Sequence, residues 1–458
     1  MKTVLQIGEG NFLRAFAQYF IQLANNNGIQ SRVVICQPRT NTAVINSLKK
    51  QHGKYNILIR GKCNSKVIDE IFPVDCVSEC VDTCSEFDKL VNLFKDNSLD
   101  VVISNTTEAG ICFNEQDRLT DCPDVSFPGK VTALLYERYN SGGSGIVFLP
   151  VELIENNGKA LKDCIEKYIK LWNLGSDFLN YVNEKCVFCN TLVDRIVTGH
   201  VDFDGDNCAV ACEPYASWLI EADEKVKNVL PFDFGDDRIA FVDSLKEYRL
   251  RKVRILNGAH TMSVLAAYHM GYDIVRDMMH DELLLSYIKK GVYDEVIPTI
   301  NLPRSELEQF ADSVLERFDN PFIDHKLLDI SLNSVSKFKA RCLGTLIDCV
   351  NLKNQLPYVI CFSLAALINF YNVRNDGGNF VSRRGGNDYE VKDSQDVLNF
   401  FLNAHKSGDV VKAVLENKSL WNTELMKIPG LYDKVNSYYQ DILSCGVRKA
   451  MEKVVVNE

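Results

Sequence analysis

Three side chains with complementary chemistry toward a carbonyl group lie close together in the sequence, at Lys252, Asn257 and His260. On an α-helix, at about 100° per residue, offsets of five and eight residues place them within one broad face. A lysine whose pKa is lowered by burial and nearby cations can give and take a proton near neutral pH. An asparagine amide can donate a hydrogen bond to an oxygen that gains charge, and a histidine can orient a hydroxyl or hold the lysine. The set suits reversible reduction of a ketone, although this spacing alone is more often that of a surface helix with a basic end.

Two glycines, Gly8 and Gly10, stand between an apolar strand over 3–7 and a helical pattern over 12–25. A dinucleotide pyrophosphate needs a tight strand-to-helix turn, close approach of the backbone and a free helix N-terminus. The usual third glycine is replaced by Leu13, and a purely structural turn is the alternative interpretation. Because the turn follows the first strand and opens a helix, the sequence favours nucleotide binding here.

Polar residues also follow other predicted strands, where open α/β sheets bind their ligands. Asn105, Thr106 and Glu108 come directly after a buried strand, and helix capping is their alternative role. The strand over 32–36 is not followed by the acidic residue that usually binds the ribose hydroxyls of NAD. Arg39 could meet a 2′-phosphate or lie in a solvated loop, so these residues leave the choice between NAD and NADP open.

The N-terminal half alternates strands with helices, whereas the C-terminal half is mainly helical. We therefore predict an α/β fold with a Rossmann-type, doubly wound domain over 1–240. Amphipathic patterns predict a mainly α-helical second domain over 241–458. The glycine-rich segments 375–379 and 384–388 predict an exposed, mobile loop. The predicted strands are 3–7, 32–36, 100–104 and 145–149, and the predicted helices of the second domain are 264–279, 283–290, 305–318 and 395–405.

The bulk composition indicates a folded protein of two domains. A chain of 458 residues exceeds one ordinary core, and 46% of its residues are hydrophobic. The net charge of -10 argues against nucleic acid or an anionic membrane as the main partner. The sequence shows no leader-peptide pattern and no run of about 18 apolar residues. We expect a cytoplasmic protein that acts on a small molecule, with no evident need of a protein partner.

The 16 cysteines are dispersed among apolar residues, which favours reduced, buried thiols over a disulfide framework. Cys186 and Cys189 form one Cys-x-x-Cys pair, but zinc sites of this kind need a second pair. No metal site is therefore predicted. Cys76, Cys80 and Cys84 recur every four residues, which is consistent with one face of a helix.

Several segments in order resemble those of the polyol-specific long-chain dehydrogenase/reductase family, which includes the mannitol dehydrogenases. The segment around Lys252 carries the Lys-x4-Asn-x2-His signature of that family, with a Leu-Asn-Gly-x-His core. The resemblance extends over nearly the whole chain. Its further segments are 8–15, 104–110, 190–196, 213–218, 317–321 and 329–338.

This resemblance implies a Rossmann-type domain followed by a helical domain, NAD as the cofactor, a sugar acid or polyol as the substrate, and no zinc. It makes Lys252 the general acid/base. It assigns Asn190 and Asn257 to the hole that polarises the substrate carbonyl, and His260 to contact with the substrate. The residues it implies around the cofactor are Gly8, Gly10, Asn11, Phe12, Asn105, Thr106 and Glu108.

A substrate that carries a carboxylate also needs a cation. Arg317 and Lys337 lie in family-like segments and are the candidates, although each is about as often a structural ion-pair partner. Glu213 is a further candidate for substrate binding, although the stretch between Asn190 and Glu213 is short compared with mannitol dehydrogenases. Within the family, the favoured interpretation is a reductase of one keto sugar acid. The alternatives are a reductase of a different keto sugar acid and a polyol dehydrogenase. Outside it, the alternative is a nucleotide-binding protein without turnover, and the intact set around Lys252 counts against that.

Overall fold

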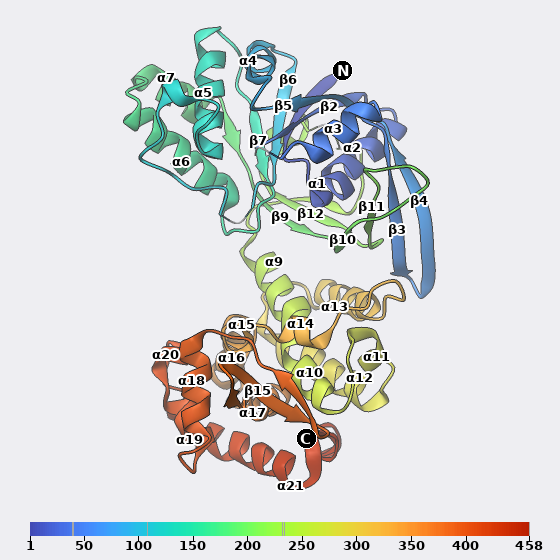
Figure 1. Cartoon of the computed structure of the whole chain (residues 1–458), viewed down its shortest axis with the longest axis vertical. Coiled ribbons are helices and arrows are strands. Elements are labelled where there is room, and N and C mark those ends of the chain that lie inside the picture. Colours follow the sequence, from blue (N-terminus) through green and yellow to red (C-terminus); the bar gives the residue numbers. More distant parts are fainter. Residues whose placement is uncertain (39–40, 108, 231, 233, 458) are drawn as a thin grey trace. The chain divides into compact units, whose positions relative to one another are not determined.

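The computed structural model describes residues 1–38, 41–107, 109–230, 232 and 234–457, and for residues 224, 225 and 457 it describes the backbone alone. The chain divides into two compact units, Met1–Leu245 and Lys246–Glu458. The N-terminal unit is built on a parallel sheet, and the C-terminal unit is built mainly of helices (Figure 1).

A six-stranded parallel sheet forms the centre of the N-terminal unit. Its strands, in spatial order, are β5 (Val77–Asp82), β2 (Ser31–Gln37), β1 (Lys2–Ile7), β6 (Leu99–Ser104), β7 (Val147–Pro150) and β8 (Val187–Phe188). Numbered along the chain within this sheet, the order is 3-2-1-4-5-6, that of doubly wound dinucleotide-binding folds. The predicted α/β, Rossmann-type architecture is confirmed.

Alternate side chains of these strands enter two separate cores, one on each face of the sheet. Val4 and Val33 point into the first core, and Leu5 and Val34 point into the second. Because both faces are buried, the strands are continuous apolar runs, which is why the sequence predicts them. Helices α2 (Ala17–Asn26) and α3 (Ala43–Lys50) cover the first core, and α4 (Phe87–Lys95), α5 (Phe127–Asn140), α6 (Asn157–Leu171) and α7 (Ser176–Glu184) cover the second.

Two smaller sheets complete this unit, and the sequence patterns do not predict them. The first contains β10 (Val197–His200), β11 (Val210–Cys212), β3 (Tyr55–Cys63) and β4 (Lys66–Val74), and the second contains β13 (Ile239–Val242), β12 (Ser217–Glu221) and β9 (Asn190–Asp194). Most side chains of β4 are exposed, so no apolar alternation marks this strand. Short helices lie at Leu119–Asp121 and at α8 (Glu224–Lys227).

Two local predictions for the N-terminal unit are wrong. The helix predicted over 12–25 is two helices, α1 (Asn11–Ala15) and α2, because the backbone leaves the helical region at Phe16, with φ of -122° and ψ of -75°. Cys76 and Cys80 lie just before and within strand β5, and not on a helix. A spacing of four residues fits one face of a strand as well as one face of a helix.

The C-terminal unit is mainly helical, as predicted. Its centre is α17 (Tyr358–Phe370), which is buried along nearly its whole length and packs against α10 (Gly258–His269) and α21 (Leu431–Asn457). The other α-helices are α9 (Lys246–Arg251), α11 (Val275–Met279), α12 (Glu282–Lys289), α13 (Arg304–Phe318), α14 (Leu327–Ser331), α15 (Ser334–Arg341), α16 (Leu343–Lys353), α18 (Gln395–Ala404), α19 (Val410–Glu416) and α20 (Lys418–Trp421). Segments Lys252–Asn257 and Lys290–Val296 are π-helical, and short 3₁₀ turns lie at Ile297–Thr299 and Leu425–Lys427.

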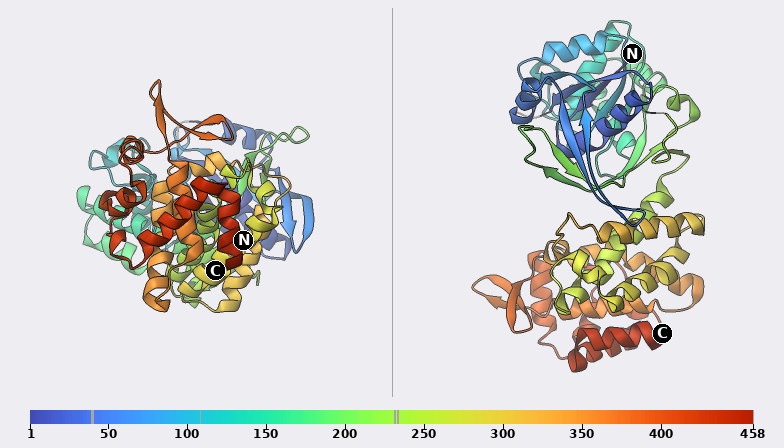
Figure 2. Two further views of the ribbon diagram at one scale, coloured as in Figure 1. Left: turned by 90° about the horizontal axis from the view of Figure 1, so that it is seen from below. Right: turned by 90° about the vertical axis from the view of Figure 1, so that its right-hand side faces the viewer.

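Two predictions for the C-terminal unit are also wrong. The helix predicted over 264–279 is broken into α10 and α11, because Gly271 between them has a φ of +105° that no helix accommodates. The expected mobile loop is an antiparallel sheet that projects from the helices in orange (Figure 2), formed by β14 (Arg374–Asp376), β15 (Asn379–Arg384) and β16 (Asn387–Glu390). Its glycine pairs have positive φ and form the two hairpin turns.

Candidate active site

Lys252 and Asn257 are the first and last residues of a π-helix, and not of the α-helix predicted from their spacing. A π-helix hydrogen-bonds residue i to residue i+5, so residues five apart lie nearly above one another. On an α-helix the same two residues would be about 140° apart. Helix α10 continues directly from Gly258, so His260 follows within the next turn. The wider turn therefore brings the backbone positions of the lysine and the asparagine closer to one face than an α-helix would.

Two ion pairs hold the π-helix on either side of Lys252. Arg251 Nη1 lies 2.5 Å from Glu306 Oε1 on α13, and Arg254 Nη2 lies 2.7 Å from Asp348 Oδ2 on α16. Both arginines are buried, whereas Lys252 is only partly buried. The backbone that carries Lys252 is thereby fixed to two other helices.

The imidazole of His260 lies against two aromatic rings. It stacks on Phe318 with a centroid distance of 3.9 Å and an interplanar angle of 10°, and it meets His325 edge to face at 5.5 Å. Burial lowers the pKa of His260 well below 6.5, and positive charges around the ring lower this pKa further. Within the described part of the chain its Nε2 has no hydrogen-bond partner. The neutral ring therefore keeps one buried nitrogen with unused hydrogen-bonding capacity.

Four basic side chains lower the pKa of His260 through the positive charge that they carry when protonated. Two of them, Arg317 and Lys337, are the predicted cations for a substrate carboxylate. The other two, His325 and Arg341, are missed by sequence reasoning, because only the packing of α13, α14 and α15 around α10 brings them near the ring. The C-terminal unit therefore gathers most of the predicted substrate residues around one segment of chain.

The turn after β1 has the features that a dinucleotide requires. Gly8 has a φ of +117°, and a Cβ there would lie 2.8 Å from Asn105 O. Gly10 precedes α1, and a Cβ there would meet no atom within 4 Å. Leu13, which replaces the third glycine, is 1% exposed, and its Cδ1 lies 3.3 Å from the Cβ position of Gly8. The turn is closed on the protein side and open at Gly10, which fits a bound pyrophosphate.

A buried carboxylate organises the end of strand β6. Thr106 donates to Glu152 Oε1 from its backbone nitrogen at 3.0 Å and from its hydroxyl at 3.1 Å. Asn105 Nδ2 donates to Val151 O at 3.2 Å. Glu152 is 2% exposed, and burial raises its pKa. Sequence reasoning missed this glutamate, although it lies only three residues after the predicted strand over 145–149. The predicted Glu108 lies outside the described residues.

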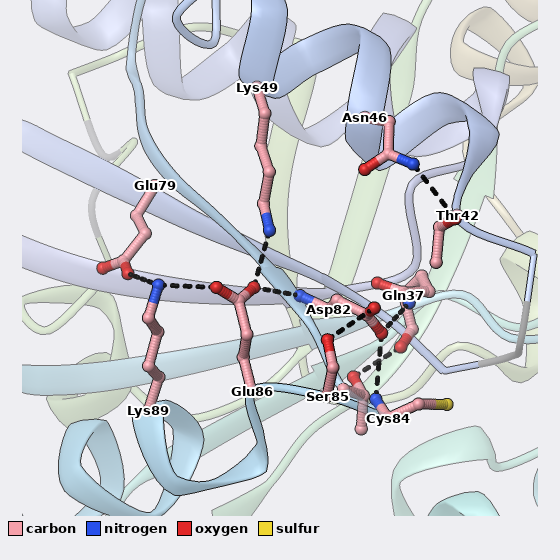
Figure 3. Close-up of polar contacts among 11 residues, drawn as sticks. Gln37, Thr42, Asn46, Lys49, Glu79, Asp82, Cys84, Ser85, Glu86 and Lys89 are labelled. Carbon is pink, nitrogen blue, oxygen red and sulfur yellow. Dashed lines mark hydrogen bonds and ion pairs between the residues drawn. The ribbon is translucent and has the colours of Figure 1, made fainter.

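A carboxylate from the neighbouring strand stands beside the end of β2 (Figure 3). Gln37 and Asp82 are register partners, and Gln37 Nε2 donates to Asp82 Oδ1 at 2.6 Å. Ser85 Oγ and Cys84 N also donate to this carboxylate, and these bonds lower its pKa. Gln37 Oε1 is buried without a hydrogen-bond partner among the described residues. The sequence could not show this acid because it belongs to the adjacent strand, and Arg39 lies outside the described residues.

Asn190 is the first residue of β9, and its amide group is held at both ends. Lys159 N, in the first turn of α6, donates to Asn190 Oδ1 at 3.0 Å. Asn190 Nδ2 donates to Glu221 Oε1 on β12 at 3.1 Å. The side chain therefore has a fixed orientation within the N-terminal unit.

Three predicted residues are engaged inside the N-terminal unit. Asn11 Oδ1 accepts a hydrogen bond from Arg14 Nη2 at 2.6 Å. The ring of Phe12 stacks on a core phenylalanine at a centroid distance of 5.0 Å. Glu213 is 1% exposed, and its Oε1 accepts from Ile196 N at 2.5 Å. The burial of Glu213 favours a structural role for this residue over contact with a substrate.

All 16 cysteines are free thiols. Burial raises the pKa of Cys186, and it raises the pKa of Cys189 to about 12. In the described ranges, no group of three or more His, Cys, Asp or Glu side chains could hold a metal ion. Over the same residues, every helix is too short or too polar to cross a membrane.

The parallel sheet has the strand order of dinucleotide-binding folds, and a helical unit that carries Lys252, Asn257 and His260 follows it. These features define a two-domain, Rossmann-type protein. The chain belongs to the mannitol dehydrogenase family. The model of the mannitol dehydrogenase Rossmann domain matches residues 2–233, and the model of the mannitol dehydrogenase C-terminal domain matches residues 244–443. The family resemblance found in the sequence is confirmed.

Curated relatives match the chain along nearly its full length. It is 36% identical over 478 residues to an altronate oxidoreductase of Halalkalibacterium halodurans, which covers 99% of this chain and 93% of that relative. It is 36% identical over 475 residues to an altronate oxidoreductase of Bacillus subtilis, covering 99% and 95%. An altronate oxidoreductase of Escherichia coli is 35% identical over 475 residues, covering 98% and 96%.

Solved structures show the same fold at low identity. A D-sorbitol dehydrogenase in substrate-free form matches with a TM-score of 0.82 and 20% identity, covering 98% of this chain and 94% of that one. A Pseudomonas fluorescens mannitol 2-dehydrogenase, in a ternary complex with NAD and D-mannitol, matches with a TM-score of 0.69 and 17% identity, covering 100% and 95%. At these identities the likeness supports the fold alone.

The contact between α6 and β9 gives a prediction about the placement of Asn190. A Cβ on Gly158 would lie 2.4 Å from Cys189 O and 2.9 Å from Asn190 N. Gly158→Ala must therefore push β9 away, and we expect it to lower the free energy of unfolding by about 1–3 kcal/mol, as overpacking does. Urea unfolding measures this loss. Lys159→Ala keeps the backbone bond to Asn190 and should change stability little, and equal stability of both variants would contradict the contact.

Proposed function

We propose that the protein catalyses the reversible, NAD-dependent reduction of D-tagaturonate to D-altronate. Membership of the mannitol dehydrogenase family and the altronate oxidoreductase relatives at 35–36% identity support an oxidoreductase that acts on CH–OH groups of sugar acids. The observation that supports the proposal is the π-turn that begins at Lys252 and ends at Asn257, with His260 following in the next turn.

The side chains of the C-terminal unit would provide the acid–base chemistry. The ammonium of Lys252 donates a proton to the substrate oxygen during reduction, and the amine takes it back during oxidation. The amide of Asn257 donates a hydrogen bond to the same oxygen as it gains charge. His260 uses its free Nε2 for a substrate hydroxyl. The role that the family resemblance gives Asn190, a second amide toward that oxygen, stays a prediction.

The N-terminal unit would hold the cofactor at the carboxyl ends of its strands. The turn from Gly8 to Phe12 offers backbone to the pyrophosphate, and Asn105 borders that turn. We assign the ribose hydroxyls to the carboxylate of Asp82, which stands where the sequence of β2 lacks an acid. Bound NADH supplies the hydride for reduction. A carboxylate at this place repels the 2′-phosphate of NADP, which is why we propose NAD.

Removal of the lysine amine tests the acid–base assignment. We expect Lys252→Ala to lower kcat by about 10²–10⁴-fold, the usual contribution of general acid–base catalysis, while the Kd for NADH is unchanged. Stopped-flow turnover and NADH fluorescence titration measure the two quantities. Lys246→Ala, which removes an exposed lysine of α9, is the matched control and should keep full activity. Full activity of the Lys252→Ala variant would refute the mechanism.

A substrate panel tests the identity of the sugar. We expect kcat/KM to be highest for tagaturonate with NADH when tagaturonate, fructuronate and fructose are compared with NADH and with NADPH. Consumption of NADH at 340 nm is the measurement. A preference for fructuronate would make the protein a fructuronate reductase, and a preference for fructose would make it a polyol dehydrogenase. Cofactor binding without turnover of any of the three would support the non-catalytic alternative.

The carboxylate beside β2 gives a prediction about cofactor choice. Asp82→Asn keeps the shape of the side chain and removes its charge, so we expect the preference for NADH over NADPH, as the ratio of kcat/KM values, to fall by about tenfold. Glu79→Gln removes a charge from an exposed position on the same strand and is the control. An unchanged ratio in Asp82→Asn would show that Asp82 does not contact the ribose.

A further inference from the structure

Arg341 is a half-buried guanidinium with few partners. It is the last residue of α15, and its Nη1 donates to Thr261 Oγ1 on α10 at 3.2 Å. Burial lowers the pKa of this group, so the structure places a positive charge where water solvates it poorly. In the described chain no carboxylate lies within ion-pair distance of it. An arginine has five N–H donors in a planar fork, and most of these remain available.

Two buried arginines of the same unit are neutralised. Arg251 pairs with Glu306, and Arg254 pairs with Asp348, both at or below 2.7 Å. Buried charges are normally paired in this way, because leaving one without a counter-charge costs free energy. Arg341 departs from this pattern, although it lies on a helix that packs against the π-helix.

Lys337 stands one helical turn before Arg341 on the same helix. Its Nζ donates to Ile330 O at 2.9 Å, and it likewise forms no ion pair with a residue that the structure describes. Burial lowers the pKa of Lys337, and the neighbouring Arg341 lowers it further, whereas the carboxylate of Asp393 opposes this. The carboxylate of Asp393 accepts a hydrogen bond from Tyr371. Two adjacent like charges in a poorly solvated place form a site that an anion would stabilise.

We propose that Arg341, together with Lys337, binds the carboxylate of the substrate, and that this pair selects sugar acids over neutral sugars. This inference rests on the proposed function and names the cations that it requires. The guanidinium fork can hold both carboxylate oxygens, and the ammonium of Lys337 adds a third charged donor. His260, whose pKa responds to both charges, places the reacting part of the sugar beside this pair.

The test compares an acid with its neutral counterpart. D-tagatose carries a hydroxymethyl group where D-tagaturonate carries the carboxylate. We expect Arg341→Gln to lower kcat/KM for tagaturonate by about 100-fold and for tagatose by less than about threefold, because a charge-assisted bidentate contact is lost only with the acid. Arg341→Lys keeps the charge without the fork and should lose less. Lys339→Gln removes a neighbouring charge on α15 and should leave the ratio unchanged.

A binding measurement separates this inference from the proposed function. Isothermal titration of the NADH-loaded protein with D-altronate and with D-altritol reports the preference for the carboxylate even when no substrate of the panel turns over. We expect the wild type to favour altronate and Arg341→Gln to lose that preference, with thermal melts confirming the fold. An equal loss with acid and neutral ligands, or an unchanged preference in Arg341→Gln, would overturn the assignment. Should Arg341→Gln fail to fold, Lys337→Gln must show the same selective loss.

Discussion

One widened helical turn determines where the reactive groups of the C-terminal unit stand. A π-turn is rarer and less favourably hydrogen-bonded than an α-turn, so it persists only when its surroundings hold it. The pairs Arg251–Glu306 and Arg254–Asp348 provide that support from α13 and α16. The same geometry brings Lys252 and Asn257 into line and starts α10 so that His260 comes next. The geometry of the proposed catalysis therefore depends on the two ion pairs that support the π-turn.

The dinucleotide turn of the N-terminal unit and the surroundings of His260 in the C-terminal unit carry different charges. At the ends of strands β2 and β6 the structure places two carboxylates, that of Asp82, which accepts from Gln37, and that of Glu152, which accepts from Thr106. Two cations lie nearby, because Lys130 donates to Pro38 O and Arg14 donates to Asn11 Oδ1. The charged groups that act on His260 are basic, and Lys337 and Arg341, which lie one helical turn apart, form no ion pair with a described residue. A cofactor with free ribose hydroxyls and a substrate with a carboxylate match these two environments. The proposed cofactor and substrate thus follow from separate electrostatic arguments.

Much of the fold could be predicted, because the central strands are buried on both faces and are therefore plain apolar runs in the sequence. The exposed strand β4 and the break at Gly271 could not, since one has no apolar alternation and the other depends on a single backbone angle. The candidate site could likewise be predicted only in part. The family signature identified Lys252, Asn257 and His260, whereas Asp82 and Arg341 became candidates only after strand pairing and helix packing placed them. The residues around Asp82 and Arg341 in the sequence form no motif that predicts binding of a ribose or of a carboxylate.

The contact between Leu13 and Gly8 has a consequence for the recognition of nucleotide-binding turns. In the common fingerprint a third glycine lets a long helix run close to the first strand. Here a buried leucine occupies that place, and the first helix ends after five residues, before the chain resumes as α2 beyond the non-helical residue Phe16. The larger side chain of Leu13 is thus accompanied by a shorter first helix. Sequences with a bulky third residue should accordingly be judged by whether an interruption follows within a turn or two, and not by counting glycines.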